Sequence, residues 1–314
     1  MKKIIILGAT GFIGRNLCEY FSKKNYSVYG TYNKKKFFKN KKIKFLKCNL
    51  LNKKQVDNCL KNKDIVIMAA ATTSGAKDII ERPYIHVTDN SIMNSIITRS
   101  AFDKKIPHVI FFSCTIMYHS QNRKIKEKDF NLNRKINPNY FGGAWMKIFS
   151  EKICEFYSKF KVNKYTVIRH SNIYGPHDKF DLQKSHVFGA TMTKVLNSNN
   201  NEITIWGKGN EKRDLLYIED LCNFVELAIR KQKNSYEIFN VGSGKLISVK
   251  NLAKKIAFQA KKKIKFNFDL TKKTIRSKVS LNCTKANKIL GWEVKNRLDS
   301  GINKTIQWYK KNII

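Results

Sequence analysis

A glycine-rich segment near the N-terminus is the first part of the chain whose residue types suggest a specific chemistry. Gly8, Gly11 and Gly14 stand in the run Gly-Ala-Thr-Gly-Phe-Ile-Gly, after a short apolar stretch and before an amphipathic one. Glycines at this spacing permit a tight turn, a close approach of backbone to a pyrophosphate and close helix packing, and the helix N-terminus donates N–H groups to the phosphates. With a strand expected before it and a helix after it, the motif predicts a dinucleotide-binding loop rather than a structural turn.

The residues after the second expected strand favour NADP over NAD, which remains the alternative. An NAD enzyme of this kind normally holds the ribose diol with a carboxylate about 20 residues beyond the glycines. The sequence has no Asp or Glu between Glu19 and Asp57, and it runs through Tyr32 and Asn33 into Lys34-Lys35-Lys36. Lysines would attract a 2′-phosphate, and no carboxylate would repel it. The competing interpretation of these lysines is a solvated loop.

The elements that must position this loop alternate in the first half of the chain, which is typical of a parallel sheet with crossover helices. We expect strands at Lys3–Leu7, Ser27–Thr31, Ile43–Cys48, Ile65–Met68, Val109–Phe112 and Tyr165–Ile168. Helices are expected at Ile13–Lys24, Lys53–Leu60, Asn90–Asp103 and Tyr140–Phe160. Six such strands predict an α/β fold with a Rossmann-type doubly wound sheet, whose ligands bind beyond the carboxyl ends of the strands.

The second half of the chain alternates less regularly, which suggests a smaller lobe. We expect a strand at Ile203–Trp206, a helix near Glu219–Arg230, a strand at Tyr236–Val241, a helix beginning at Ser248, then a short strand and a last helix over Leu298–Tyr309. Residues 1–175 are predicted to form an NADP-binding domain, joined by a later segment of about 221–245. Residues 176–314 are predicted to form a C-terminal α/β substrate lobe.

Composition excludes several other classes of protein. A chain of 314 residues with 42% hydrophobic residues can bury a sizeable core, and its seven scattered cysteines suggest neither a disulfide framework nor a metal site. The longest apolar runs are too short to span a membrane, so we expect a cytoplasmic protein. The formal charge of +39 comes mostly from lysine spread along the whole length. We therefore expect neither nucleic acid nor a membrane as a partner.

Motifs in family order give the chain a resemblance to the extended short-chain dehydrogenases that modify nucleotide sugars, and among them to the GDP-L-fucose synthases. They comprise the glycine loop, Met68-Ala69-Ala70-Ala71, Asn172-Ile173-Tyr174-Gly175-Pro176-His177-Asp178, Ser185-His186-Val187, Trp206-Gly207 followed by Arg213, Tyr217-Ile218-Glu219-Asp220, Asn240-Val241-Gly242-Ser243-Gly244 and Leu290-Gly291-Trp292. The resemblance implies an NAD(P)-dependent oxidoreductase or epimerase. Its substrate would be a hexose, for example a 4-keto hexose, carried on a nucleoside diphosphate. GDP is the expected base, with UDP and dTDP as alternatives.

The resemblance also implies roles for individual residues. It places His186 at the acid/base histidine, a role that an imidazole can fill near neutral pH. It places Arg213 at a substrate diphosphate, which a guanidinium can bind with two hydrogen bonds. Further substrate contacts are expected at Asn172, Val187, Lys194 and Trp206. Cofactor contacts are expected at Gly8, Thr10, Gly11, Phe12, Ile13, Gly14, Tyr32, Asn33, Lys34, Asn49, Leu50, Ala69, Ala70, Ala71, Lys147, His170, Asn172 and Ile173.

The chain departs from the family where proton transfer takes place. Family members carry a tyrosine four residues before the catalytic lysine, but Gly143 stands four residues before Lys147. Tyr140 is the nearest phenol, and seven residues of regular helix separate it from Lys147 by about 10 Å along the axis. A direct pair with Lys147 therefore requires an irregular start of the helix. Tyr140 is thus either a replacement acid or a packing residue.

The loop after the fifth strand departs from the family as well. The position of the family's catalytic Ser or Thr falls on Cys114, with Ser113 and Thr115 on either side. A shift of one residue would bring Ser113 or Thr115 into use. The position of the epimerising cysteine of fucose synthases falls on Ile116.

Three function classes remain open from sequence. The first is an active nucleotide-sugar oxidoreductase or epimerase, and the second is a protein that binds the cofactor and the sugar nucleotide with little turnover because of Gly143. The third is a nucleic-acid-associated protein, which charge alone suggests. The resemblance further implies a homodimer in which Asn90–Asp103 and Tyr140–Phe160 pair with their symmetry mates as a four-helix contact.

Overall fold

A parallel seven-stranded sheet forms the centre of the computed structural model, which describes residues 1–34, 38–73, 81–182, 184–272, 274–275 and 277–314. Its strands follow the order β10-β6-β5-β4-β1-β2-β3, and all neighbours are parallel. The strands are β1 (Lys2–Leu7), β2 (Tyr26–Tyr32), β3 (Ile43–Lys47), β4 (Ile65–Met68), β5 (His108–Cys114), β6 (Lys164–His170) and β10 (Tyr236–Val241). The order reverses between β1 and β4, and in such sheets ligands bind at that point beyond the carboxyl ends.

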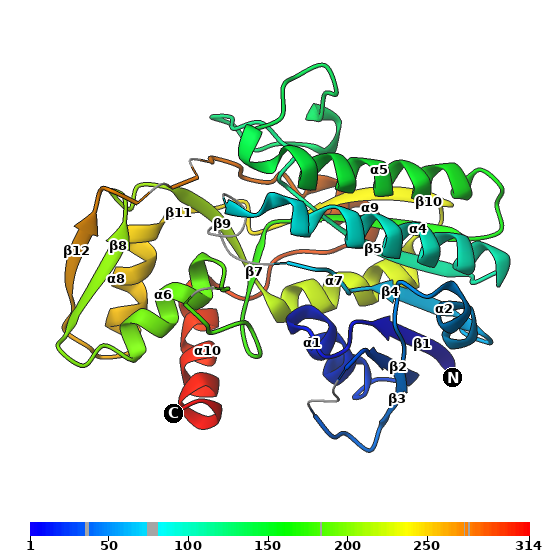
Figure 1. Ribbon diagram of the computed structural model, residues 1–314, viewed down its shortest axis with the longest axis horizontal. Coiled ribbons are helices and arrows are strands. Elements are labelled where there is room, and N and C mark those ends of the chain that lie inside the picture. The colour runs from blue at the N-terminus through cyan, green and yellow to red at the C-terminus, as the bar shows by residue number, and fades with distance from the viewer. Residues whose placement is uncertain (35–37, 74–80, 183, 273, 276) are drawn as a thin grey trace.

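Helices cover both faces of this sheet because its strands are apolar on both sides (Figure 1). Ile4 and Ile6 of β1 belong to one core, while Ile5 and Leu7 belong to the other. The first core includes residues of α1 (Phe12–Phe21), α7 (Ile218–Lys231) and α9 (Thr284–Leu290). The second core includes residues of α2 (Lys53–Leu60), α4 (Thr88–Asp103) and α5 (Phe141–Ser158).

A smaller lobe projects beyond the carboxyl edge of the sheet, on the left in Figure 1. It contains α6 (Val187–Leu196), α8 (Val249–Gln259) and α10 (Leu298–Asn312), with β8 (Glu202–Trp206) parallel to β12 (Lys265–Asp269). A three-stranded sheet of β11 (Leu246–Ser248), β9 (Lys212–Tyr217) and β7 (Asn172–Tyr174) connects the two parts. The described residues also form three short 3₁₀ turns: η1 (Pro83–His86), η2 (Glu127–Asp129) and η3 (Pro138–Tyr140).

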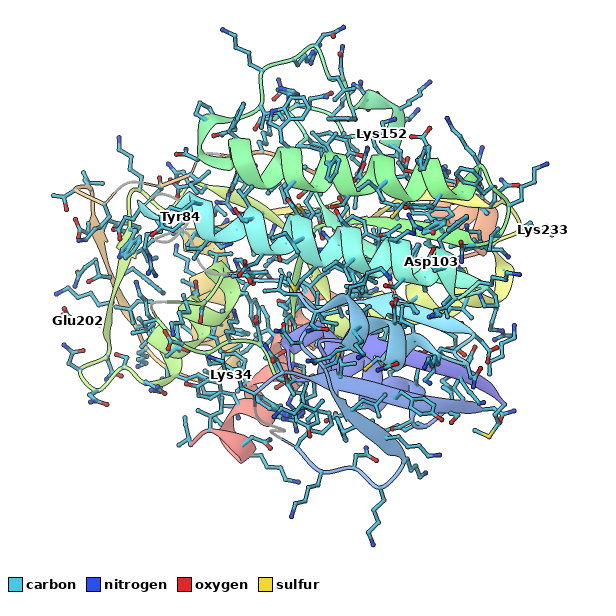
Figure 2. The ribbon with its side chains drawn as sticks, turned by 45° about the vertical axis from the view of Figure 1, so that its right-hand side comes forward. Lys34, Tyr84, Asp103, Lys152, Glu202 and Lys233 are labelled. Atoms are coloured by element: carbon cyan, nitrogen blue, oxygen red, sulfur yellow. The ribbon has the colours of Figure 1, made fainter. Side chains whose placement is uncertain are left out.

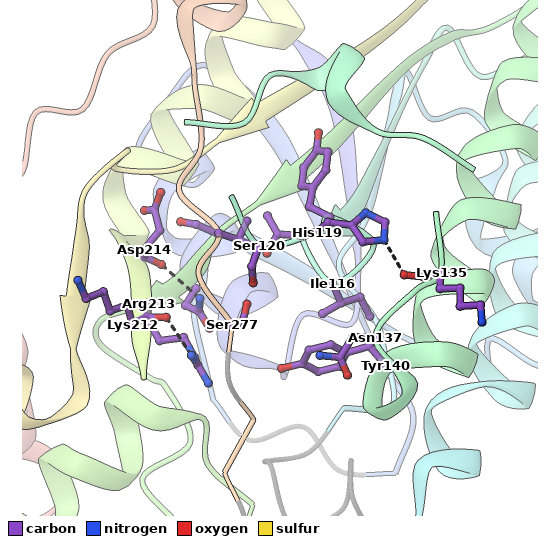
Figure 3. A pocket seen from close by; sticks show the side chains of 15 residues that line it. Ile116, His119, Ser120, Lys135, Asn137, Tyr140, Lys212, Arg213, Asp214 and Ser277 are labelled. Atoms are coloured by element: carbon purple, nitrogen blue, oxygen red, sulfur yellow. Dashed lines mark hydrogen bonds between the residues drawn. The ribbon is translucent and has the colours of Figure 1, made fainter. Parts of the chain in front are cut away.

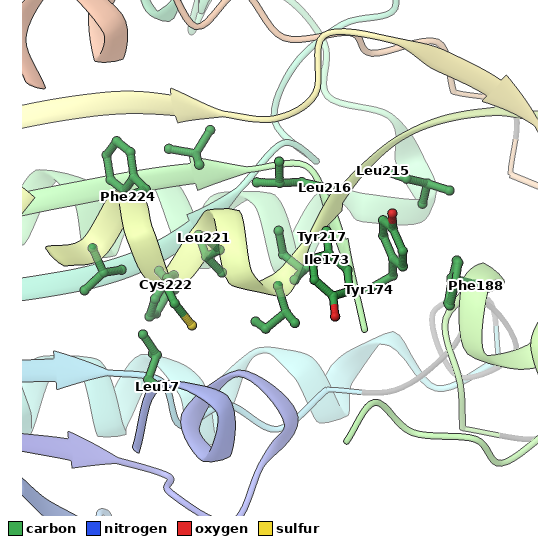
Figure 4. Close-up of a cluster of buried hydrophobic side chains, with 14 of the residues drawn as sticks. Leu17, Ile173, Tyr174, Phe188, Leu215, Leu216, Tyr217, Leu221, Cys222 and Phe224 are labelled. Carbon is green, nitrogen blue, oxygen red and sulfur yellow. The ribbon is translucent and has the colours of Figure 1, made fainter. Parts of the chain in front are cut away.

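Aromatic side chains join the lobe to the large sheet (Figure 4). The ring of Tyr174 lies 4.3 Å from that of Phe188 on α6 and 5.5 Å from that of Tyr217 on β9, measured between centroids. All three are buried and share one hydrophobic core with Leu221 of α7. This continuous core fixes the lobe against the large sheet.

The predicted α/β fold with a Rossmann-type sheet is confirmed. All six expected strands of the first half are present, with ends that differ by at most two residues, and the strand at Tyr236–Val241 joins the same sheet beside β6. In the later part the short strands β7, β9 and β11 and the helices α6 and α9 were not expected. No helix within the described residues is long and apolar enough to span a membrane.

Candidate functional site

The glycine loop between β1 and α1 forms a cradle that larger residues would fill. Gly8 adopts φ +84°, and a Cβ there would lie 2.7 Å from the Cα of Ala70. A Cβ on Gly14 would lie 2.1 Å from the carbonyl oxygen of Gly8. Both contacts are far inside van der Waals distance, so the two positions require glycine. Gly8, Gly14 and the predicted Ala69–Ala71 segment thus meet at the switch point of the sheet.

The N-terminus of α1 opens into this cradle with its N–H groups free. The loop is held from outside, because the Gly8 N–H donates to the Thr31 hydroxyl at 3.0 Å and the Ala9 N–H donates to the Thr31 carbonyl at 2.9 Å. Gly11 is the N-cap residue and supplies no side chain. Among the described residues, no acceptor takes the N–H groups of Phe12 and Ile13. Free N–H groups at a helix N-terminus favour a phosphate, so the cradle fits a dinucleotide.

The end of β2 carries no acid, as the sequence predicts. Tyr32 ends the strand, and Asn33 and Lys34 follow it with exposed side chains, while Lys35 and Lys36 lie outside the described residues. Arg15 of α1 adds a second cation that sequence reasoning missed. Its guanidinium lies 4.5 Å from the ring centroid of Phe38, although its Nε also binds Glu19 at 3.0 Å. The predicted residues Asn49 and Leu50 lie just after β3, the strand next to β2.

Lys147 lies in the interior at the carboxyl edge of the sheet. Its Nζ donates to the carbonyl oxygen of Phe112 at 2.7 Å, which ties α5 to β5. Burial lowers the pKa of Lys147, while the nearby Cys114 and Glu151 act to raise it. His170 ends β6, and burial lowers its pKa to about 4, so its ring is neutral at physiological pH.

Tyr140 and Arg213 line one cavity of about 210 Å³ (Figure 3). Figure 3 shows the phenol of Tyr140 pointing across the cavity towards the guanidinium of Arg213. Arg213 is fixed by bonds from its guanidinium to the carbonyl oxygens of Lys212 at 2.9 Å and Ile275 at 3.0 Å. Burial raises the pKa of the Tyr140 phenol, and the charge of Arg213 opposes that rise. The predicted residues Thr115 and Asn172 line the same cavity.

Tyr140 reaches the cavity because α5 begins irregularly. The regular helix starts at Phe141, and Tyr140 belongs to the preceding 3₁₀ turn, with φ −110° and ψ 3°. The two-turn separation calculated for a regular helix therefore does not apply to Tyr140 and Lys147. An irregular helix start is the condition that the sequence analysis set for a direct contact between Tyr140 and Lys147.

Gly143 faces Ile116 rather than open space. A Cβ on Gly143 would lie 3.3 Å from the Cδ1 methyl of Ile116. The residue at the family's epimerising-cysteine position therefore borders the place that the family's tyrosine would take. The two departures seen in the sequence are neighbours in space and fit each other sterically.

The three residues at the end of β5 face different surroundings. Ser113 is fully buried, and its hydroxyl donates to Glu151 at 2.5 Å, so it is turned away from the cavity. Cys114 is partly exposed, and burial raises the pKa of its thiol although Lys147 opposes the rise. Thr115 lines the cavity. Of the two hydroxyls that flank Cys114, Thr115 is thus the one within reach of a bound substrate.

The remaining predicted substrate residues lie in the small lobe, outside the described lining of that cavity. His186 precedes α6 and Val187 begins it. His186 is exposed, and the surrounding protein together with the charges of Lys179 and His86 lowers the pKa of its imidazole. Lys194 lies 5.7 Å from the ring centroid of Trp206 and donates to the Thr204 carbonyl at 2.7 Å.

Comparison with known proteins agrees with this arrangement. Residues 4–242 match the NAD dependent epimerase/dehydratase family. The chain belongs to this family. It is 27% identical to GDP-L-colitose synthase of Yersinia pseudotuberculosis over 98% of this chain and 97% of that protein. It is 26% identical to GDP-L-fucose synthase of Escherichia coli over 84% of this chain and 86% of that protein. The UDP-glucose 4-epimerase of Thermotoga maritima shares the fold, with a TM-score of 0.87, 23% identity and coverage of 99% and 100%.

A buried ion pair supports the active face of this epimerase/dehydratase family member. The Arg169 guanidinium binds the Glu151 carboxylate at 2.6 Å and 3.0 Å, and both side chains are at most 4% exposed. Glu151 also accepts from Ser113, and Arg169 donates to the Tyr118 hydroxyl at 3.0 Å. This network holds β5, β6 and α5 in register directly behind Lys147 and Cys114.

Several residues of the site are not evident from the sequence alone. Ser120 and Ser277 line the cavity from irregular segments, where no periodicity marks a position. Arg15 follows the last glycine of the loop directly, and that placement is a signal that could have found it. Ile116 was noted only as a missing cysteine, but its contact with position 143 makes it a residue that shapes the site.

Proposed function

We propose that this chain is an NADP-dependent nucleotide-sugar reductase acting on a 4-keto hexose carried on GDP. The observation that carries the proposal is the cavity in which the Tyr140 phenol faces the Arg213 guanidinium at the carboxyl edge of the sheet. The cavity lies beside the end of β5 and the start of α5, the helix that carries Lys147. Its hydroxyl and cationic groups suit a sugar and a diphosphate.

The cofactor residues present fit NADP. The cradle of Gly8 and Gly14 and the free N–H groups of α1 would hold the pyrophosphate. Lys34, with Arg15 close to the same strand end, would attract the 2′-phosphate, and no carboxylate follows β2 to hold a ribose diol. When bound, the cofactor supplies a hydride to the sugar carbon.

Tyr140 supplies the proton in this proposal. As the carbonyl carbon accepts a hydride, its oxygen takes a proton from the phenol, which leaves a phenolate that the Arg213 charge stabilises. Thr115 donates a hydrogen bond to the same oxygen. Lys147 would bind the cofactor. The bulk solvent then returns the proton to Tyr140.

Binding of the anionic substrate raises the pKa of His186 in this proposal. In the free protein its imidazole is neutral at pH 7, because its pKa lies below its usual value. A bound diphosphate adds negative charge near the N-terminus of α6, which raises the affinity of the ring for a proton. Arg213 and the Lys194–Trp206 pair are proposed to hold the diphosphate and the base. The colitose and fucose synthases among its relatives support GDP as that base.

Ile116 favours reduction over epimerisation. An isoleucine has no ionisable group, so it cannot exchange a proton with a ring carbon. Cys114 is the nearest thiol on this strand, and its raised pKa keeps it protonated at neutral pH. We therefore propose hydride transfer as the main reaction.

A homodimer through α4 and α5 is part of the proposal. α5 carries a stripe of exposed aromatic side chains spaced four and seven residues apart: Phe141 (61% exposed), Trp145 (41%), Phe149 (52%) and Phe156 (54%). Figure 2 shows α4 and α5 lying side by side on one face. Exposed aromatic side chains gathered on one helix face support pairing with a second copy.

A second candidate is a protein that binds the cofactor and sugar nucleotide with little turnover. The observation that favours it concerns position 143, where the family carries its acidic tyrosine. Gly143 supplies no phenol there, and the Ile116 methyl takes up part of the space that a phenol would need. This alternative differs from the first only in the rate of the chemical step.

The test is a nicotinamide absorbance assay with NADPH and with GDP-, UDP- and dTDP-linked 4-keto hexoses, together with calorimetric titration of each ligand. We expect tight binding and NADPH oxidation with the GDP sugar. Binding of the GDP sugar without oxidation would leave the binding protein as the function. Preferential turnover of a UDP or dTDP sugar would change the substrate class.

A further inference from the structure

The topology gathers lysines onto one edge of the large sheet, although they are spread along the sequence. In a parallel sheet all strands begin at the same edge, so the loops that lead into them meet there. Every one of the seven strands begins with, or is preceded within five residues by, exposed lysines. We call this set the lysine edge; it comprises Lys2, Lys3, Lys23, Lys24, Lys41, Lys42, Lys61, Lys104, Lys105, Lys159, Lys161, Lys231 and Lys233.

The charge of the lysine edge is hardly neutralised. Within the described part of the chain, only Lys24 of this set forms an ion pair, with Glu226 at 3.3 Å. Two acids lie nearby without pairing with these lysines: Asp64 keeps its charge while it accepts the Lys3 backbone N–H at 2.7 Å, and Asp103 binds Arg99 at 2.7 Å. The ammonium groups therefore act together as a positive field over the whole edge.

The lysine edge follows the row of strand starts. Seven strands spaced about 4.8 Å apart give a row of roughly 30 Å. It forms the right-hand side of Figure 1, where the N-terminus lies, and Lys233 projects from that side in Figure 2. The cleft with Tyr140 and Arg213 lies at the opposite edge. A surface bound at the lysine edge would leave the substrate cleft open.

Apolar side chains project among these lysines. Phe160 is 54% exposed and Val162 is 38% exposed, in the loop Lys159-Phe160-Lys161-Val162 before β6. Met1 is 77% exposed beside Lys2 and Lys3. Exposed lysines with apolar groups between them suit anionic headgroups, with the apolar groups entering the headgroup layer. Lysine predominates at this edge, where Arg230 is exposed beside Lys231; arginine is the residue best suited to bind phosphates and bases of nucleic acid with paired hydrogen bonds.

We propose that the lysine edge docks this protein on an anionic lipid surface. The attachment is peripheral and electrostatic, so it is reversible and weakens as salt screens the charges. The nucleotide-sugar cleft then faces away from the lipid. This partner lies outside the expectation from sequence, which predicted neither nucleic acid nor a membrane as a partner.

The test is flotation of the full chain with vesicles of phosphatidylcholine and phosphatidylglycerol, at low and at high salt, with pure phosphatidylcholine vesicles in parallel. The test variant replaces four lysines from four loops of the edge by glutamine: Lys61, Lys104, Lys159 and Lys233. The matched control replaces four exposed lysines of the small lobe, which also have no ion pair among the described residues: Lys208, Lys254, Lys310 and Lys311. Both variants lose the same formal charge.

We expect the edge variant to lower the vesicle partition coefficient at least about tenfold, and the control variant to change it less than about twofold. Both variants should keep the thermal unfolding temperature and the NADPH affinity of the parent, so lost lipid binding is distinguishable from misfolding. Equal loss in both variants, or no binding of the parent to anionic vesicles, would overturn the proposal. Tighter binding of the parent to duplex RNA at the same salt, lost only in the edge variant, would also overturn it in favour of nucleic acid.

Discussion

Replacing Gly143 by tyrosine tests whether Tyr140 has taken over the acid role. Position 143 lies one helical turn before Lys147, so a phenol there could reach both that ammonium and the sugar oxygen. The structure adds an obstacle, because the new Cβ would lie 3.3 Å from the Cδ1 methyl of Ile116 and the ring would extend further. The informative variants are therefore Gly143→Tyr alone and Gly143→Tyr with Ile116→Ala.

The magnitudes follow from this contact. Removing a helix-interior glycine stabilises by about 0.5–1 kcal/mol, and forcing extra atoms against Ile116 costs about 1–3 kcal/mol. The single variant should thus unfold at equal or lower denaturant concentration than the parent. Its hydride transfer should fall, because the added ring crowds the cavity beside Tyr140. The double variant relieves the overpacking.

Tyr140→Phe provides the decisive background. Loss of a general acid should lower the rate of hydride transfer by about 10²–10⁴-fold. In that background, Gly143→Tyr with Ile116→Ala should recover at least about tenfold of the lost rate, whereas Ile116→Ala alone should recover none. Stopped-flow absorbance of NADPH with a saturating GDP-linked 4-keto hexose measures each rate. The reasoning is refuted if Tyr140→Phe keeps the parent rate, or if Gly143→Tyr alone raises it.

Three further outcomes are expected. Lys34→Glu should weaken NADPH binding, so that the affinity for NADPH exceeds that for NADH by less than in the parent or falls below it. Calorimetric titration that finds equal affinities of the parent for NADPH and NADH would contradict the cofactor assignment. Trp145→Glu should convert a dimer into a monomer by placing a charge in the α5 stripe; light scattering that finds the parent monomeric at micromolar concentration would remove that interface. Stability should fall on acidification because burial lowers the pKa of His108 to about 3. Between pH 6.5 and about 3, His108 binds a proton in the unfolded state but not in the folded state. The free energy of unfolding should therefore fall by about 1.4 kcal/mol for each pH unit below about 6.5 because of this histidine. Urea unfolding at pH 7.5 and 5.5 measures it, and His108→Gln should flatten the dependence.

Periodicity predicted the large sheet well because its strands are buried on both faces. Runs such as Ile65–Met68 are continuously apolar and flanked by polar residues, so their limits are visible in the sequence. The short strands β7, β9 and β11 are three to six residues long and take their partners from distant segments. Such pairing depends on tertiary contacts, which a local pattern does not carry.

The candidate site divides in the same way. The places of the glycine loop and of Lys147 in the fold were predictable because each depends on a local element with a fixed spacing. Ile116 and Gly143 were both visible as departures, but only the fold shows that they touch. The orientation of Ser113 towards Glu151 likewise depends on α5 packing against β5, which no sequence spacing reveals.

Isotope transfer tests the proposed reaction most directly. NADPH deuterated at the transferable position of its nicotinamide would be incubated with the parent protein and a GDP-linked 4-keto hexose, and the product sugar examined by NMR and mass spectrometry. The account predicts one deuterium per turnover, bonded to the carbon that carried the carbonyl group. A product without that deuterium, or unchanged substrate despite saturating binding of both ligands, would contradict hydride transfer as the function of this protein.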